Sequence, residues 1–181
     1  DQSTYTISRD DGCADPVLTQ EIRRLGLDYK EAHQKFIPEE YLIDSVENRI
    51  QLLQGLMDGD GTVGQESMGH SVSYTTVSRI LAEGIQFLVQ SLGGKASMRL
   101  KKTTFTYKGE KKEGQVAYVL NISTLNLREV FSLSRKRDRV VERTKYLPKR
   151  MIDKIEYLGK QEAQCILVDH PEHLYLTNHC V

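Results

Sequence analysis

The chain has 181 residues, of which 39% are hydrophobic and 28% charged, and its formal net charge is zero. These values are typical of a globular protein with one large domain, or with one domain and a fragment of another. No apolar run approaches the roughly 20 residues of a membrane-spanning helix, and no secretory signal opens the chain, so we expect no membrane partner.

The chain contains three cysteines, Cys13, Cys165 and Cys180. They are too few for a closed disulfide framework and lack the Cys-x-x-Cys spacing of zinc sites. A reducing, intracellular location in the cytoplasm is therefore predicted. Zero net charge argues against binding by gross attraction to a polyanion, although the charges are unevenly distributed along the chain.

The first predicted element is a helix that begins at Asp15-Pro16 and ends at Gly26. Aspartate is a good N-cap residue, and proline is favoured at the first helical position. A short turn or a single helical turn is expected over 36–42.

The clearest element is an apolar helix that Ser45 caps and that ends at two carboxylates, Asp58 and Asp60. Its apolar residues cover nearly half of the circumference, which indicates burial against a partner. These residues are Ile50, Leu52, Leu53, Leu56 and Met57. Gly55, at the edge of this arc, would let a second helix come close. Because the negative end of the helix dipole disfavours an acid, we expect a metal ion or another cation near the two carboxylates.

After Gly61 the hydrophobic period changes from helical to alternating, which indicates strands. A lysine-rich turn joins the last two predicted strands, and a basic run over 135–145 follows the last predicted helix. The predicted strands cover 62–76, 96–107 and 115–123, and the predicted helices cover 78–92 and 125–133. The core side of the first of these helices is expected to comprise Ile80, Leu81, Ile85, Leu88, Val89 and Leu92.

Pro148 marks a predicted boundary, beyond which the apolar residues follow a strand-like pattern to the end of the chain. The predicted fold class is therefore α+β with an appended all-β segment. We place the first domain over 1–148 and the appended segment over 149–181.

Residues 53–61, LQGLMDGDG, resemble the LAGLIDADG motif of homing endonucleases. Residues 35–42, KFIPEEYL, resemble the KxIPxxxL block that precedes the second such motif in endonucleases carried by inteins. Residues 164–177 resemble the penultimate splicing block of inteins. The chain thus resembles the C-terminal portion of an intein that carries a LAGLIDADG endonuclease. This resemblance implies an αββαββα endonuclease half, over about 35–133, followed by β strands of an all-β Hint-type splicing domain.

The resemblance implies that Asp60, at the eighth position of the motif, is the metal-binding acid, with Asp58 as a second candidate. Each helix of the family's paired core brings one such acid to a shared site. There, Mg²⁺ or Mn²⁺ activates a water and stabilises the leaving oxygen of a phosphodiester. Family members also use a lysine on the last strand, where this chain has Gln115, so Lys111 and Lys112 become the catalytic candidates. From the residues alone, a helix-terminating turn is the alternative role for the two aspartates.

The resemblance also implies double-stranded DNA as a partner, held in its major groove by the polar face of the sheet. The basic run could add phosphate contacts. A solvated surface is the alternative for each of these residues. The predicted DNA contacts are Ser71, Ser73, Thr75, Arg99, Lys101, Arg135, Lys136 and Arg137.

In the C-terminal segment, His173 matches the histidine that helps the terminal asparagine of an intein to cyclise. Cys165 falls where many inteins carry Asp and some carry Cys, and it could tune the transferred ester or thioester. A surface histidine and an inert cysteine are the alternatives. A working intein ends in His-Asn, whereas Asn178-His179-Cys180 has another order, so we expect the last residues of the intein to be missing.

We therefore expect an incomplete intein with Mg²⁺-dependent homing endonuclease activity, located wherever its host protein is. Its partners would be the host exteins and an N-terminal portion that supplies the splicing nucleophile and the first LAGLIDADG motif. Since one acid is present where two are needed, the isolated chain is not expected to make double-strand breaks. Two other interpretations remain open: a homodimeric one-motif endonuclease, and a DNA-binding module without catalysis.

Overall fold

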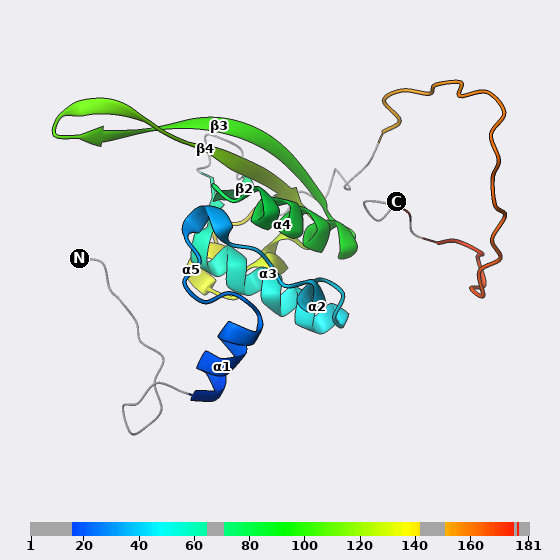
Figure 1. Cartoon of the computed structure of the whole chain (residues 1–181), viewed down its shortest axis with the longest axis horizontal. Coiled ribbons are helices and arrows are strands. Elements are labelled where there is room, and N and C mark those ends of the chain that lie inside the picture. The colour runs from blue at the N-terminus through cyan, green and yellow to red at the C-terminus, as the bar shows by residue number, and fades with distance from the viewer. Residues whose placement is uncertain (1–15, 65–70, 142–150, 176, 178–181) are drawn as a thin grey trace.

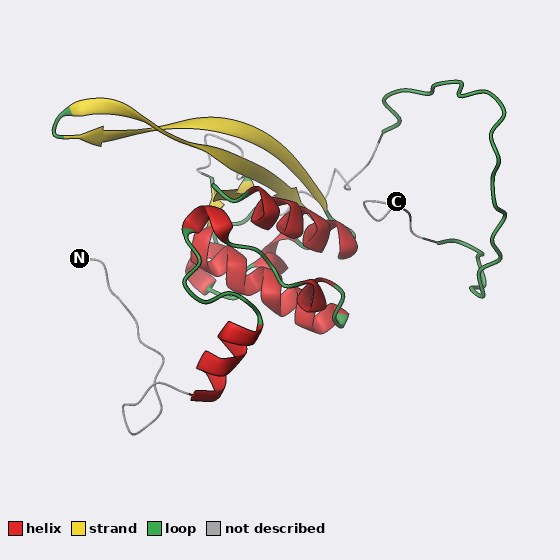
Figure 2. Ribbon diagram, in the orientation of Figure 1, coloured by secondary structure: helices red, strands yellow, loops and turns green. Residues whose placement is uncertain are grey.

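Helices cover one face of a four-stranded sheet in the computed structural model, which describes residues 16–64, 71–141, 151–175 and 177 (Figures 1 and 2). No helix in these ranges is long and apolar enough to cross a membrane. The helices are α1 (Pro16–Arg24), α2 (Glu39–Leu42), α3 (Val46–Asp60), α4 (Arg79–Ser91) and α5 (Ser134–Arg137), with 3-10 turns η1 (Ala32–Gln34) and η3 (Leu127–Val130). The strands are β1 (Gly61–Val63), β2 (Val72–Thr76), β3 (Lys95–Tyr107) and β4 (Glu110–Ser123).

The motif helix α3 forms as predicted, because both of its ends are specified locally. At its start, the Ser45 hydroxyl accepts a hydrogen bond from the Asn48 amide at 3.2 Å. At its end, the chain passes from Asp60 directly into β1 at Gly61. A Cβ atom at Gly61 would lie 2.4 Å from the Met57 carbonyl oxygen, so a larger residue would collide with the helix.

The sheet has the strand order β1-β2-β4-β3, and each neighbouring pair is antiparallel. The predicted strand over 62–76 is divided into β1 and β2, while residues 65–70 lie outside the described part. In β2, Val72 and Tyr74 point toward the helices, and the intervening Ser73 faces the other way. Alternation of this kind allows one face of the sheet to be buried and the other to stay polar.

Helix α4 covers the sheet and begins at the predicted cap Ser78, whose hydroxyl accepts from the Leu81 amide at 3.1 Å. The prediction that Ile80 lies on the core side of this helix is wrong, because its side chain is 63% exposed and Ala82 is buried instead. At the other end, Gly93 closes the helix with a φ of 78°. The core between the layers includes Leu53, Met57, Val72, Tyr74, Leu81, Ala82, Ile85, Leu88, Val89, Leu120 and Ile122.

Strands β3 and β4 form a long hairpin whose tip projects beyond the helices (Figure 1). Its turn is the pair Lys108-Gly109, with φ of 50° and 82°, as in a type I′ turn. This turn is shorter than predicted, so Lys111 and Lys112 lie in β4 and not in a loop. The two-residue turn matches the twist of the strands, and pairing therefore continues to the end of the hairpin.

The predicted helix over 125–133 is wrong in its length. Only the 3-10 turn η3 forms, and Phe131 after it is extended and buried. The amides of Ser132 and Leu133 donate to the Asp58 carboxylate, and not to carbonyl groups of a continuing helix. A tertiary contact therefore ends this element and begins α5.

The predicted strands beyond Pro148 are not found in residues 151–175 and 177, which contain no helix or strand. Their large apolar side chains are exposed: Met151 by 90%, Tyr157 by 92% and Leu167 by 89%. A strand needs a partner for its backbone groups and apolar face, and the described residues supply none here. The Hint-type strands are therefore not confirmed. The predicted domain boundary at 148/149, the cap Asp15 and the Asn178-His179-Cys180 sequence lie outside the described residues.

Candidate functional site

Asp60 is the last residue of α3, and its carboxylate is exposed at the junction with the sheet. Its Oδ2 atom lies 3.4 Å from the hydroxyl of Tyr74, which is only 3% exposed. Burial, together with the nearby Asp60 charge, raises the pKa of Tyr74 to about 12. The phenol therefore stays protonated at neutral pH and donates to the carboxylate.

A cavity of about 300 Å³ lies beside this pair. Two lysines that the sequence analysis did not assign to the site, Lys30 and Lys35, line it together with Asp60. The Lys35 carbonyl accepts from the buried Ser78 hydroxyl at 2.6 Å, which ties this segment to the start of α4. The sequence contained a signal for Lys35, because this lysine is the first residue of the KFIPEEYL block. The full lining is Leu27, Lys30, Lys35, Phe36, Leu56, Asp60, Tyr74 and Leu81.

Asp58 points to a different part of the molecule and caps the start of α5. Its carboxylate accepts from the amides of Ser132 and Leu133, each at 3.2 Å, and from the Ser132 hydroxyl. Partial burial acts to raise the pKa of Asp58, but these hydrogen bonds and the charge of Lys136 hold it below the ordinary value. The structure thus gives Asp58 a capping role, whereas it was a candidate metal ligand in the sequence.

Lys136 is the cation that the dipole argument predicts at the end of the motif helix. Its ammonium donates to the carbonyl oxygens of Met57 at 2.9 Å, Asp58 at 2.7 Å and Gly61 at 2.7 Å, with Gly59 at 3.3 Å. Burial and the Arg135 charge lower the pKa of Lys136, against the opposite effect of the nearby aspartates. We expected Lys136 to contact phosphate, but its ammonium is engaged inside the protein. The phosphate roles of Arg135 and Arg137 stay predictions.

The predicted DNA-contacting residues of the strands lie on one face, opposite the helices. Ser73 of β2 and Ser97 of β3 both pair with Asn121 of β4. In the next outward-facing row, Thr75 and Arg99 both pair with Val119, and Lys101 follows opposite Ala117. Since directly paired residues share a face, Ser73, Thr75, Arg99 and Lys101 form one polar surface. Ser71 lies just before β2 and is exposed.

Lys111 and Lys112 do not line the cavity at Asp60. Lys111 pairs with Thr106 and Lys112 with Phe105, beyond a register shift between Lys102 and Thr104 that interrupts the alternation of β4. The Lys112 ammonium lies 5.0 Å from the centre of the Tyr107 ring, as in a cation–π contact. Both residues lie close to the tip of the hairpin, so the catalytic role predicted for them receives no geometric support in this chain.

The two residues predicted for splicing lie in the exposed C-terminal segment. Cys165 is a free, exposed cysteine. The His173 ring nitrogen Nδ1 lies 3.1 Å from the Val168 carbonyl oxygen, and the His173 amide donates to the His170 carbonyl at 2.8 Å. These local contacts form a turn, but the structure does not bring Cys165 and His173 to a common site.

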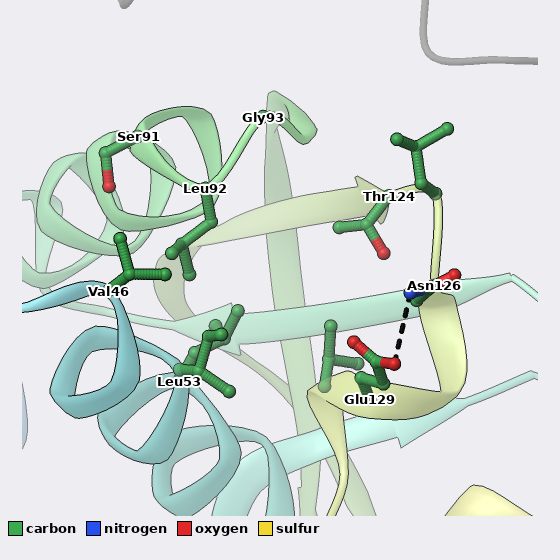
Figure 3. A pocket seen from close by; sticks show the side chains of 11 residues that line it. Val46, Leu53, Ser91, Leu92, Gly93, Thr124, Asn126 and Glu129 are labelled. Atoms are coloured by element: carbon green, nitrogen blue, oxygen red, sulfur yellow. Dashed lines mark hydrogen bonds between the residues drawn. The ribbon is translucent and has the colours of Figure 1, made fainter.

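A second cavity, of about 360 Å³, lies at the opposite end of α3 (Figure 3). Val46 and Leu53 of α3, Leu92 after α4 and Val130 of η3 supply much of its apolar lining. Glu129 is the one acid of the lining, and it accepts from the Asn126 side-chain amide at 3.1 Å. Its lining reaches along α3 as far as Leu53, which lies seven residues, or about 10 Å along the helix axis, before Asp60. It is therefore distinct from the acidic end of the motif.

We predict that Asp58→Asn destabilises the protein by about 1 kcal/mol at pH 7, since an ionised cap of α5 is lost. A carboxyl group with a lowered folded-state pKa stabilises the fold above its unfolded pKa, and this contribution is lost as the pH falls through the folded value. The difference from wild type should therefore shrink below about pH 4. Urea denaturation at pH 7 and pH 3 measures it. Asp138→Asn, at the exposed aspartate that follows α5, is the control; equal effects of both variants would contradict the capping role.

Comparison with known proteins gives one family match. Residues 47–134, from α3 to the start of α5, match the LAGLIDADG-like domain. The replicative DNA helicase DnaB of Mycobacterium intracellulare is 32% identical over 148 residues, which cover 80% of this chain and 24% of the helicase. The ATP-dependent DNA helicase Hel308 of Thermococcus kodakarensis is 44% identical over 70 residues, or 37% of this chain and 6% of that protein.

A solved structure of I-DmoI, in complex with its target DNA in the presence of Mg, covers 68% of this chain and 67% of its own, with 17% identity and a TM-score of 0.32. The chain thus spans about a quarter or less of the curated relatives that it matches. The family match coincides with the helix that ends at Asp60 and with the sheet beneath it. Residues 47–134 are therefore a LAGLIDADG-like domain.

Proposed function

We propose that this chain is one half of a divalent-metal-dependent DNA endonuclease carried by an intein. The observation that carries the proposal is the exposed Asp60 carboxylate at the end of the motif helix, beside a cavity lined by Lys30 and Lys35. An acid that can hold a metal and cations that can face a phosphate are the groups that phosphodiester hydrolysis needs. The LAGLIDADG-like match over 47–134 supports the same reaction.

The donor set fits a shared metal better than a metal held by this chain alone. In the part of the chain that the structure describes, no group of three or more His, Cys, Asp or Glu side chains could hold a metal ion. Asp60 offers one carboxylate, and Mg²⁺ accepts one or two carboxylates with water completing its shell. When bound, the metal would activate a water and stabilise the leaving oxygen. Asp60 would hold it, and Lys35 and Lys30 would offset the charge of the phosphate.

A second acid can reach this site because one face of α3 is open. Leu52, Gly55, Leu56 and Gly59 follow one another at helical spacing, and both glycines are exposed. A Cβ atom at Gly55 or Gly59 would meet nothing within 4 Å. A second helix with the same pattern could therefore pack closely here and bring its own acid beside Asp60. A complementary half and a second copy of this chain both satisfy this geometry.

The polar sheet face supports DNA as the ligand. Arg99 and Lys101 provide cations for phosphate, and Ser73 and Thr75 provide hydroxyls that can reach base edges. The projecting hairpin of β3 and β4 extends this surface beyond the helices (Figure 1). A long, two-stranded surface of this kind fits the major groove of a duplex.

The intein context has two supporting observations. The two helicases carry different names, yet each matches this chain over a small part of its own length, as expected for an element inserted into unrelated hosts. In addition, the exposed apolar residues of 151–175 require a partner, which an N-terminal splicing portion would supply. His173 and Cys165 would then act in splicing, beside the host exteins.

We expect Asp60→Asn to abolish DNA cleavage while retaining DNA affinity, since the amide is a poor ligand for Mg²⁺ but keeps the shape of the side chain. The assay measures nicking and double-strand cleavage with Mg²⁺, with and without a complementary half, and binding with Ca²⁺ in place of Mg²⁺. Asp138→Asn is the matched control and should cleave like wild type. Cleavage by Asp60→Asn at the wild-type rate would contradict the proposal, and absence of cleavage in every form would favour a DNA-binding module.

Lys101→Ala should weaken DNA binding several-fold and reduce the salt dependence of the affinity by about one charge, because one phosphate contact is lost. Lys102→Ala is the control: it removes the same charge from the adjacent position, which pairs with Val116 on the opposite face. Fluorescence anisotropy at several salt concentrations measures both. An equal loss of DNA affinity in the two variants would mean that DNA does not bind preferentially to the polar face.

His173→Ala should slow splicing and lead to accumulation of unspliced or partly cleaved precursor, because a proton donor for asparagine cyclisation is lost. The measurement requires the chain extended by the terminal His-Asn and combined with an N-terminal splicing portion, placed between two flanking segments and followed by gel electrophoresis. His170→Ala, three residues earlier in the same turn, is the control. If both variants splice like wild type, His173 has no role in the reaction.

A further inference from the structure

We infer that Tyr74 is a positioning residue that holds the Asp60 carboxylate ready for a divalent cation. The inference deepens the proposed function and rests on it. Tyr74 would act through Asp60 and not by touching DNA. Its hydroxyl and the Asp60 Oδ2 atom are 3.4 Å apart, and both residues line the same cavity.

The location of Tyr74 in the sheet directs its side chain to the end of α3. It lies in the middle of β2, opposite Gly61 of β1 and Leu120 of β4. Because Gly61 has no side chain, the tyrosine ring has room on this face beneath the helix end. The ring is buried, with 3% exposure, so packing fixes its orientation. A side chain held in this way can restrain a more exposed neighbour.

The hydrogen bond has a defined direction. An ionised carboxylate can only accept, so the phenol must be the donor. This contact occupies Oδ2 and leaves Oδ1 of the exposed Asp60 side chain available to a cation. A separation of 3.4 Å is long for an O–H···O hydrogen bond, and contacts at such sites often shorten when the ligands are bound.

A partner of this kind should change metal affinity more than protein stability. Groups that orient a metal-binding side chain typically affect affinity by about 10- to 100-fold. Because the contact is long and only one carboxylate is involved, we expect the loss of Tyr74 to change the metal affinity by the smaller of these factors. Since Ser73 and Thr75 flank Tyr74 and face the polar side, β2 also fixes the metal-binding acid relative to the DNA-contacting surface.

The test is Tyr74→Phe in the full chain combined with a complementary half that supplies the second acid. Phenylalanine keeps the ring and removes only the hydroxyl. Binding of Mn²⁺ is followed by electron paramagnetic resonance, which distinguishes free from bound ion. We expect the Kd for Mn²⁺ to rise about tenfold, with unchanged DNA affinity in the absence of metal and little change in Tm. Tyr118→Phe is the control, since Tyr118 lies on the same face of the neighbouring strand.

Asp60→Asn distinguishes a failure of the positioning role of Tyr74 from a failure of the metal-binding role of Asp60. If Asp60→Asn weakens Mn²⁺ binding but Tyr74→Phe and Tyr118→Phe both bind like wild type, the positioning role of Tyr74 is overturned and the metal-binding role of Asp60 stands. If Asp60→Asn binds Mn²⁺ like wild type, the proposed metal site fails, and the inference about Tyr74 fails with it. A loss of Mn²⁺ affinity in Tyr74→Phe alone, at unchanged Tm, supports the inference.

Discussion

The structure depends on a reciprocal cap between two helices that are far apart in the chain. Asp58, near the end of α3, accepts from the amides of Ser132 and Leu133 immediately before α5, while Lys136 of α5 donates to the last carbonyls of α3. Each charge lies where the helix dipole favours it, and each satisfies backbone groups that the helix leaves open. The two contacts fix the end of α3, and hence the place from which Asp60 is presented.

Strand β2 joins the two surfaces that a DNA-cleaving protein needs. Tyr74 points inward to Asp60, and its neighbours Ser73 and Thr75 point to the polar face. Because alternate residues of a strand face opposite ways, this one short strand fixes the position of Asp60 relative to the polar face that we propose as the DNA-binding surface. The two lysines of the cavity come from another segment, which the hydroxyl of Ser78 ties to α4.

Two apolar surfaces of the chain remain exposed within the described residues. One is a face of α3 on which Gly55 and Gly59 are exposed and Leu52 and Leu56 are half-buried, and the other is the segment 151–175. Both are consistent with the proposal that this chain associates with another polypeptide portion. The difference is physical: a helix forms its own hydrogen bonds and folds without that partner, whereas a strand cannot.

The sequence by itself determined the elements that depend on local signals. Ser45 and Ser78 cap helices, alternation marks β2, and Gly61 ends the motif helix, because neighbouring residues decide these features. A nine-residue pattern also made Asp60 the candidate metal ligand, which stays a prediction. Only the tertiary structure showed that Asp58, unlike Asp60, binds backbone amides, and that Lys136 binds the carbonyls at the end of α3. It also showed that Lys35 and Tyr74 lie beside Asp60. These roles depend on contacts between residues 14 to 79 positions apart, which no local period encodes.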